Sequence, residues 1–331
     1  MCSGQSVVID GKIYFGGGKA ENEDDCYRVY CYNPAQDKWT SLPSLPVKYF
    51  GLGKIDGKLV AVGGEMKDGS KSLSVYTFDT RWKQNFPPLL SVRLHPAVIS
   101  HKSMLVVAGG EYFDQTTKTV ETCGLTRPLW YKTPLNSLPT SCIELSTVSS
   151  DSEKKYYAIG GKKGQQNLNQ AMYLSVDDLR WKSGRSMTYS TTDDIPVMKN
   201  LPTNPLLLSK VLSNSVDDLR HTAKLLKEKQ ENESPWKVLP NTPTYSPAAA
   251  MLAGSLIAVG GWDKPEKGTP QTNIFKYSSG IVNSWIYIGD LLAPRAKTTA
   301  AVLSPTEVLV IGGWDGSNIS QAVYKLTLHL D

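Results

Sequence analysis

The sequence has 331 residues, of which 36 are Lys or Arg, 31 are Asp or Glu and 40% are apolar. A net charge of +5 is too mild for a dedicated nucleic-acid-binding protein, and no apolar run is long enough to cross a bilayer. The 27 Gly, 20 Pro, 16 Tyr and 8 Trp favour an all-β fold, because turns use Gly and Pro while strands favour aromatic residues.

The cysteines and the amino-terminal residues indicate in which cellular compartment the protein lies. Five cysteines are scattered along the chain, at Cys2, Cys26, Cys31, Cys123 and Cys142. Residues 1–6 lack the basic start and apolar core of a secretory signal. We therefore expect reduced thiols and a cytoplasmic protein, since disulfides persist mainly in oxidising compartments.

A short apolar strand that ends in a glycine pair occurs six times. The second glycines of these pairs are Gly17, Gly64, Gly110, Gly161, Gly261 and Gly313. Successive pairs are 47, 46, 51, 100 and 52 residues apart. A period near fifty that breaks once, at twice its length, indicates a repeat fold.

The order of elements after each pair is also regular. A polar loop leads into a strand that contains a tyrosine or a similar residue, as in 29–34. A tryptophan follows 18 to 24 residues past the pair in four units, at Trp39, Trp82, Trp130 and Trp285. A Leu/Pro stretch such as 42–46 then precedes the next strand. Four short strands per unit describe one propeller blade, in which we expect the Gly and Trp residues to be structural.

With these motifs the chain resembles the kelch-repeat family. The segments Gly260–Asp263 and Gly312–Gly316 are similar to the family's glycine-pair loops, and the resemblance covers nearly the whole chain except residues 180–235. It implies an all-β, kelch-type β-propeller. It is specific for the fold and much less so for the function.

The doubled spacing between Gly161 and Gly261 allows two interpretations. We expect six four-stranded blades with a long insertion, residues 180–235, in blade 4; seven blades, one of them degenerate, is the alternative. Both Trp181 and Trp236 can belong to the fourth strand there, and Trp236 has the better Leu/Pro continuation. A capping box and helical spacing predict a short helix at about 215–229 inside the insertion.

The last blade lacks an obvious fourth strand. The chain opens on a first strand, residues 5–9, and ends just past a third strand, residues 322–326. Kelch rings usually complete the last blade with a strand from the other terminus, and nothing upstream of Gln5 supplies one. We expect residues 1–331 to form one propeller domain. One explanation for the missing fourth strand is that the sequence is a fragment of a longer protein.

Catalytic and metal-binding patterns are mostly missing from the sequence. It has no phosphate-binding loop, no paired C-x-x-C and no H-E-x-x-H. A copper site like that of propeller oxidases would need His95 and His329, which no motif supports. We expect no enzyme and no cofactor; a sugar-binding, mutarotase-like or copper oxidase-like propeller is the alternative.

The face of the ring is the expected binding surface. In peptide-binding kelch propellers the contact residues lie just before each innermost strand and just after each glycine pair. Carried onto this chain, that pattern predicts a partner-binding set of Tyr49, Glu65, Arg93, His95, Glu111, Glu144, Tyr245, Trp262, Arg295, Lys297 and Trp314. We expect Tyr49, Arg93, Tyr245 and Arg295 to face one common pocket, because Tyr and Arg often dominate interface energies.

The sequence therefore predicts a protein-interaction module that binds a peptide or protein segment, with no nucleic-acid or membrane partner. In longer kelch proteins such rings often serve as substrate receptors of cullin ubiquitin ligases, joined to a BTB domain, which this chain does not contain. Actin binding is a second use in the family.

Overall fold

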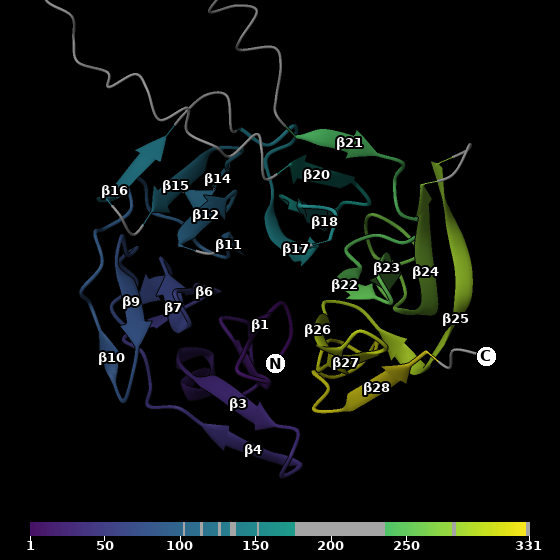
Figure 1. The fold of residues 1–331 in the computed structure, drawn as a ribbon, viewed down its shortest axis with the longest axis horizontal. Helices are drawn as coiled ribbons and strands as arrows, with labels where there is room; N and C mark the ends of the chain where they lie inside the picture. Colours follow the sequence, from purple (N-terminus) through teal and green to yellow (C-terminus); the bar gives the residue numbers. More distant parts are fainter. Residues whose placement is uncertain are drawn as a thin grey trace, which may run out of the picture.

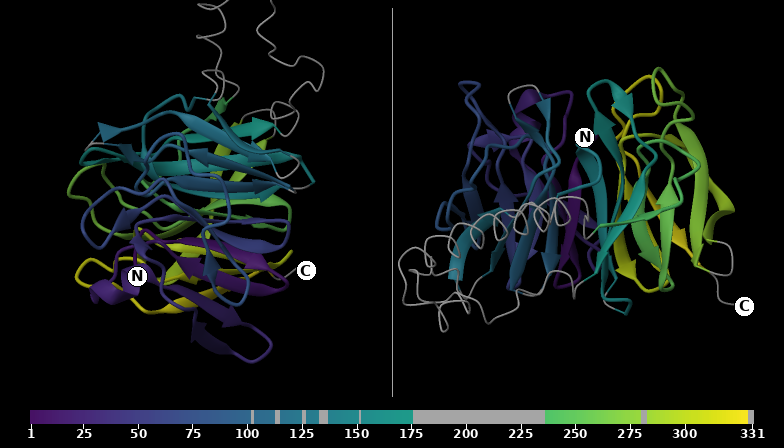
Figure 2. Two further views of the ribbon diagram at one scale, coloured as in Figure 1. Left: turned by 90° about the vertical axis from the view of Figure 1, so that its left-hand side faces the viewer. Right: turned by 90° about the horizontal axis from the view of Figure 1, so that it is seen from above.

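The computed structural model describes residues 1–101, 103–112, 115–124, 127–132, 137–150, 152–175, 236–279 and 283–328. Six small antiparallel sheets stand around a central axis like the blades of a propeller (Figure 1). Viewed from the side, they form one ring with its strands running roughly along the axis (Figure 2). The prediction of an all-β propeller with six blades is confirmed.

Each of the first three blades has four strands, ordered from the axis outwards. Blade 1 consists of β1 (Gln5–Ile9), β2 (Lys12–Gly16), β3 (Val29–Asn33) and β4 (Lys38–Ser41). Blade 2 consists of β6 (Gly51–Ile55), β7 (Lys58–Val62), β9 (Val75–Phe78) and β10 (Trp82–Lys83). Blade 3 consists of β11 (Ala97–His101), β12 (Met104–Ala108), β15 (Val120–Gly124) and β16 (Arg127–Lys132).

The other three blades follow the same order. Blade 4 consists of β17 (Ile143–Ser150), β18 (Lys155–Lys163), β20 (Ala171–Ser175) and β21 (Lys237–Leu239), with β19 (Gln166–Asn167) added to β18. Blade 5 consists of β22 (Ala248–Leu252), β23 (Ser255–Val259), β24 (Gln271–Ser279) and β25 (Asn283–Arg295). Blade 6 has three strands in the described part of the chain: β26 (Thr299–Ser304), β27 (Glu307–Ile311) and β28 (Val323–Thr327).

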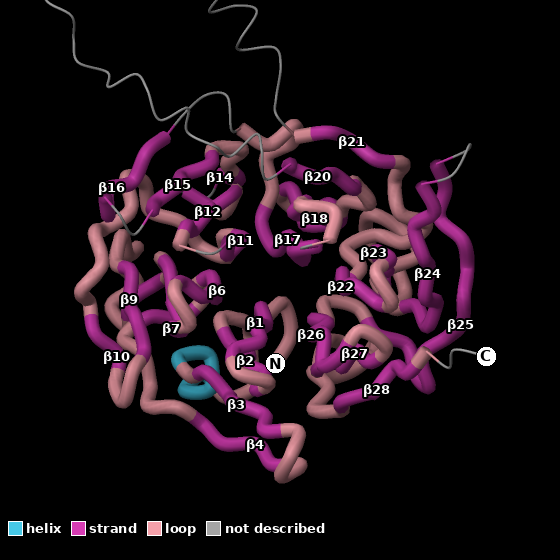
Figure 3. The backbone as a smooth tube through the Cα atoms, in the orientation of Figure 1, coloured by secondary structure: helices cyan, strands magenta, loops and turns pink. Residues whose placement is uncertain are grey.

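The loops between the blade strands contain short ladders and one short helix. Two small ladders, β5 (Val47–Lys48) with β8 (Glu65–Met66) and β13 (Glu111–Tyr112) with β14 (Gln115–Thr116), lie beyond the glycine pairs. One 3-10 helix, η1 (Glu23–Tyr27), precedes β3 and is the helical segment drawn in Figure 3. Asn22 caps it by accepting a hydrogen bond from the backbone N–H of Asp24, which satisfies a donor left free at the helix start.

The ring closes where β1 meets β26. The innermost strands follow one another around the axis, and the N-terminus lies near the axis between blade 1 and blade 6 (Figure 1). The Ser6 hydroxyl donates to the Ala300 carbonyl at 3.2 Å and lies 3.3 Å from the Thr299 hydroxyl. Inner-strand packing therefore holds this seam, although blade 6 has only three strands among the described residues.

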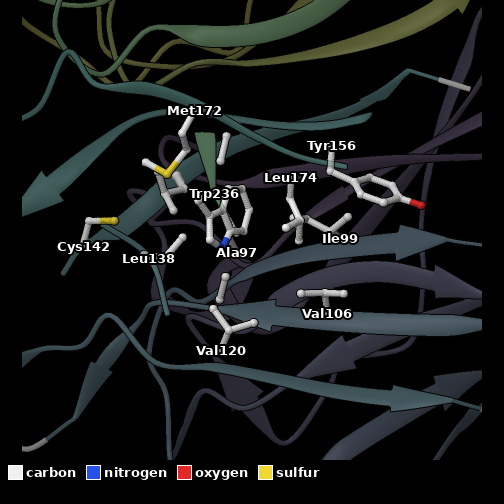
Figure 4. Close-up of a cluster of buried hydrophobic side chains, with 13 residues drawn as sticks. Ala97, Ile99, Val106, Val120, Leu138, Cys142, Tyr156, Met172, Leu174 and Trp236 are labelled. Atoms are coloured by element: carbon white, nitrogen blue, oxygen red, sulfur yellow. The ribbon is translucent and has the colours of Figure 1, made fainter. Parts of the chain in front are cut away.

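The hydrophobic core lies between neighbouring blades. In the largest cluster, Ala97 and Ile99 of blade 3 face Met172 and Leu174 of blade 4, with the Trp236 ring between them (Figure 4). Trp236 is 3% exposed. Because each sheet buries its faces only against its neighbours, no blade is expected to be stable alone.

Trp236 also marks the start of the fourth strand of blade 4. It directly precedes β21, which pairs with β20 and so supplies the fourth strand, as its Leu/Pro continuation predicted. Trp181, the helix predicted at about 215–229 and the rest of 176–235 lie outside the described residues.

The glycine pairs join each blade to the next. Both glycines have positive φ in five of the pairs, for example 69° at Gly63 and 99° at Gly64. The Gly64 N–H donates to the Arg93 carbonyl at 2.9 Å, and a Cβ on Gly63 would come within 2.6 Å of that same oxygen. Glycine is required here for its conformation and for this close approach.

In the described residues, no helix is both long and apolar enough to span a membrane. All five cysteines are buried and free of disulfides.

Replacing Gly63 by Ala should destabilise the protein more than replacing Gly57 by Ala. Both residues have similar positive φ, 69° and 72°, but a Cβ on Gly57 meets no atom within 4 Å. The strain of a left-handed Ala, about 1 kcal/mol, is common to both variants, so any additional loss measures the contact with the Arg93 carbonyl. Urea unfolding of the two variants checks this, and equal losses would contradict a role for the contact.

Candidate functional site

Six residues with left-handed backbone conformation, one from each blade, lie where the chain enters the innermost strands. Their φ values are 55° at Ser3, 59° at Tyr49, 48° at His95, 57° at Glu144, 48° at Ser246 and 53° at Lys297. We call these six residues the entry ring. Non-glycine residues seldom adopt this conformation, and its repetition in every blade shows that the fold itself imposes it.

Neighbouring members of the entry ring contact one another. The His95 N–H donates to the Tyr49 carbonyl at 2.8 Å, and the two aromatic rings lie 4.6 Å apart. The Ser3 N–H donates to the Lys297 carbonyl at 2.8 Å. The Ser3 hydroxyl donates to Glu144 Oε2 at 3.0 Å, which joins blade 1 to blade 4 across the axis.

The entry ring surrounds one end of the central channel. A cavity of about 320 Å³ opens there, which we call the mouth cavity; it is lined by Cys2, Ser3, Lys19, Tyr49, Glu65, Lys71, Leu94, His95, Glu111, Ile143, Glu144 and Lys297. Below the ring lies a smaller cavity of about 50 Å³, and a further cavity of about 250 Å³ lies between the innermost strands. The mouth cavity therefore has charged walls and only a small cavity beneath its floor.

Burial and neighbouring charges shift the pKa values of two entry-ring side chains. Burial lowers the pKa of His95, and Lys297 lowers it further, while Glu144 opposes both effects. Burial would raise the pKa of Glu144, but Lys297, His95 and the Ser3 hydrogen bond hold it below its ordinary value. A neutral imidazole and an ionised carboxylate therefore share the floor at neutral pH.

The charges of the rim are only partly neutralised. Lys48 and Lys71 both pair with Glu65, and Lys48 pairs also with Glu23 at 2.7 Å. Within the described residues, Glu111 and Lys297 form no salt bridge of their own. Free positive and negative groups thus lie on one rim, which suits a ligand that carries both charges.

Six of the eleven predicted site residues line the mouth cavity. They are Tyr49, Glu65, His95, Glu111, Glu144 and Lys297. The other five, Arg93, Tyr245, Trp262, Arg295 and Trp314, do not line it. The expectation that Tyr49, Arg93, Tyr245 and Arg295 face one common pocket is therefore not met by the structure.

Arg93 is a structural residue in this geometry. Its side chain and that of Glu121 are both 0% exposed, and Nη2 lies 2.8 Å from Glu121 Oε1. Nε also donates to Glu121 Oε1, at 3.2 Å, and the other guanidinium hydrogens go to the Gly109 carbonyl and to the carbonyl and hydroxyl of Thr119. Every side of the guanidinium is occupied inside blade 3, so none is left for a ligand.

Arg295 lies in the equivalent position before blade 6 and is 5% exposed. Its Nη2 donates to the Tyr324 hydroxyl at 2.8 Å, and its guanidinium lies over the Tyr324 ring at 5.2 Å. The backbones of Tyr245 and Trp262 exchange two hydrogen bonds, while Trp314 pairs in the same way with Ala296. These ladders correspond to the one between Leu94 and Glu111, so both tryptophans lie beside the rim without entering the cavity.

Sequence reasoning did not name Cys2, Ser3 and Lys71 of the mouth cavity. It also did not name Ser246 of the entry ring, which lines the cavity below the mouth cavity. The signal for Ser3 and Ser246 was present: each lies two residues before an innermost strand, as Tyr49, His95 and Lys297 do. Tyr245 was chosen over Ser246 for its residue type, although backbone position decides which side chain faces the channel.

No group of three or more His, Cys, Asp or Glu among the described residues is arranged to hold a metal ion. His329, one of the two histidines considered for copper, lies outside the described residues.

Replacing Arg93 by Met should cost about 3 to 5 kcal/mol of unfolding free energy, because it leaves Glu121 buried without its counter-charge. Replacing Arg28 by Met is the matched control, since its side chain is 40% exposed and lies 3.9 Å from Asp25. The control should lose at most about 1 kcal/mol. Chemical denaturation distinguishes the two, and a mild loss at Arg93 would restore it as a candidate contact residue.

Stability should fall as the pH drops below the ordinary His pKa of 6.5, because folded His95 binds a proton more weakly than unfolded His95. The lowered pKa of Glu144 adds a further loss below its ordinary 4.5. Replacing His95 by Phe keeps a ring against Tyr49 and should flatten the fall between pH 7 and 5.5. Thermal melting of the wild type and the variant between pH 7 and 5.5 checks this prediction. Identical slopes of melting temperature against pH would show that His95 does not control the loss of stability.

Comparisons with known proteins agree with this architecture. A model described as the Kelch motif matches residues 2–46. Beta-scruin of Limulus polyphemus is 24% identical over 249 residues, which are 69% of this chain and 26% of that protein. Kelch-like protein 15 of Homo sapiens is 32% identical over 104 residues, 28% of this chain and 17% of that protein. The matches thus span about a quarter or less of these relatives.

Among solved structures, that of YjhT is similar with a TM-score of 0.67 and 15% identity, and the match covers 99% of this chain and 95% of that one. At this identity the likeness supports the fold alone. The repeated glycine pairs, the six blades and the matched motif agree: the chain carries kelch repeats and forms a kelch-type β-propeller.

Proposed function

We propose that the chain is a protein-interaction module that binds a segment of a partner protein at the mouth cavity. The observation that carries the proposal is the entry ring itself: five of its six residues line the mouth cavity and present hydroxyl, phenol, imidazole, carboxylate and ammonium groups around one opening. A surface that presents five different chemical groups suits an asymmetric ligand, and loops on a rigid scaffold commonly carry recognition.

The size of the cavity indicates what enters it. About 320 Å³ accommodates one or two side chains of a peptide, with the rest of the segment lying on the rim. Tyr49 packed on His95 offers an aromatic surface to such a side chain. Lys297 attracts a carboxylate and Glu111 a basic group, so an amphoteric segment fits better than a strongly acidic one.

The finer roles belong to the same proposal. The kelch resemblance implies that the ring selects a substrate for a ubiquitin-ligase assembly, in which BTB and cullin components would come from outside this chain. The five free, buried cysteines support a cytoplasmic location, where thiols stay reduced.

The test compares captured partners of the full chain and of a mouth variant. Tyr49→Asn with Glu111→Lys removes the aromatic surface and inverts one charge, and Asn tolerates the left-handed backbone at position 49. We expect this variant to lose specific partners about tenfold or more in quantitative affinity capture while keeping its melting temperature.

Lys58→Glu is the matched control, since Lys58 is exposed at the opposite end of blade 2, where β6 turns into β7. Its partners should be those of the wild type. Partners retained by the mouth variant, or lost equally by the control, would overturn the assignment of this face.

A further inference from the structure

The carboxylate of Glu144 lies at the bottom of the mouth cavity. Glu144 lines both the mouth cavity and the smaller cavity of about 50 Å³ below it. Its Oε2 accepts the Ser3 hydroxyl at 3.0 Å, so the side chain reaches from blade 4 towards blade 1. The carboxylate is therefore placed where a ligand side chain that enters the mouth cavity would end.

The backbone that carries this carboxylate is fixed by its neighbours in the entry ring. The Glu144 N–H donates to the His95 carbonyl at 3.3 Å, and the His95 N–H donates to the Tyr49 carbonyl at 2.8 Å. Three successive members of the entry ring are thus joined around the opening. A charge held on a preorganised backbone binds a counter-charge with little loss of conformational entropy.

Glu144 is ionised without a cation in direct contact. Burial works against its ionisation, yet Lys297 and His95 hold the pKa of Glu144 below its ordinary value. In the described part of the chain neither of them forms a salt bridge with it, and its printed hydrogen-bond donor is the neutral Ser3 hydroxyl. A ligand cation would give this carboxylate a charge-assisted hydrogen bond, which is stronger than a neutral one.

The partly buried wall of the mouth cavity carries more unpaired negative than positive charge. Glu111 and Glu144 are both partly buried and form no salt bridge among the described residues. Of the three ammonium groups that line the cavity, Lys71 is already paired, Lys19 is exposed and Lys297 is partly buried. Because solvent weakens the charge of an exposed group, two carboxylates face one ammonium inside the cavity.

The imidazole beside Glu144 also suits a cation. Burial lowers the pKa of His95, so the ring is neutral at pH 7 and does not repel a positive group. Its Nδ1 is buried without a hydrogen-bond partner among the described residues. In the tautomer that carries its hydrogen on Nε2, this nitrogen is an acceptor that an N–H group of a ligand would satisfy.

We propose that the partner segment inserts a lysine or arginine side chain into the mouth cavity and that Glu144 binds its charged end. The inference rests on the proposed function and adds to it the chemical group that enters the cavity. A guanidinium suits the site well, because its five N–H donors can serve a carboxylate and an imidazole nitrogen together. Lys297 then remains for an acidic group elsewhere in the segment, which keeps the whole ligand amphoteric.

The first experiment selects ligands without assuming their sequence. A displayed library of random dodecapeptides is passed over the full chain and, in parallel, over the mouth variant Tyr49→Asn with Glu111→Lys. We expect the wild type to enrich peptides that share one lysine or arginine position, and the mouth variant to enrich none of them.

The outcomes of this selection separate the two proposals. Peptides that depend on the mouth cavity but share no basic position would contradict the inference and leave the proposed function standing. No enrichment that depends on the mouth cavity would overturn the proposed function, and the inference with it.

The second experiment titrates an enriched peptide into the full chain and follows its fluorescence anisotropy. Glu144→Gln keeps the size of the side chain and an acceptor for Ser3, and it should weaken binding about tenfold through loss of one charge-assisted hydrogen bond. A neutral peptide analogue, with citrulline in place of arginine or norleucine in place of lysine, should bind the wild type about tenfold more weakly. Glu144→Gln should weaken binding of this analogue no further, because the two changes remove the same interaction.

Glu307→Gln is the matched control. It removes a carboxylate at the start of β27, where Glu307 pairs with Lys325 at 3.1 Å, and it should leave binding of both peptides unchanged. Equal weakening of the basic and neutral peptides by Glu144→Gln would overturn the assignment of Glu144. Equal weakening by Glu144→Gln and Glu307→Gln, in variants that keep the wild-type melting temperature, would overturn it as well.

Discussion

The ring depends on one backbone hydrogen bond that recurs at four blade junctions. The N–H of the second glycine of a pair donates to a carbonyl just before the next innermost strand. The bonds are those of Gly64 to Arg93, Gly110 to Cys142, Gly261 to Arg295 and Gly313 to Met1, at 2.8 to 3.1 Å. Two successive residues with positive φ bring the N–H to that carbonyl, and only glycine adopts this conformation without strain. The same bond at Met1 gives blade 1 its place against blade 6, so the amino terminus takes part in closure.

This bond also determines which side chains reach the central channel. A residue whose carbonyl is held by a glycine pair lies in the junction between blades, and Arg93 and Arg295 are buried there for that reason. Two residues later the chain turns through a left-handed residue, and that side chain lies at the opening, as His95 and Lys297 do. A structural residue and a residue that faces the channel thus lie two positions apart.

The repeat made the fold predictable from sequence, because glycine pairs at a period near fifty and a tryptophan in or next to the fourth strand of five blades leave few architectures. The strand order in blade 4 followed from Trp236 and its continuation. The lining of the mouth cavity was predictable in part: the place of Tyr49, His95, Glu144 and Lys297 at the start of an innermost strand indicated that they face the channel. Arg93 and Arg295 were misassigned because residue type was weighed above backbone position. Their partners, Glu121 and Tyr324, lie 28 and 29 residues further along the chain, where no local pattern marks them.

The seam between β1 and β26 has a consequence for folding. Its hydrogen bonds join Ser6 to residues 293 and 294 positions away, whereas the first and second strands of each blade are joined by short turns. Closing so long a loop has a large entropic cost before any contact rewards it, so local hairpins form first and the seam forms late. During synthesis, blade 1 therefore leaves the ribosome with one face uncovered and keeps it so until the last blade has been made.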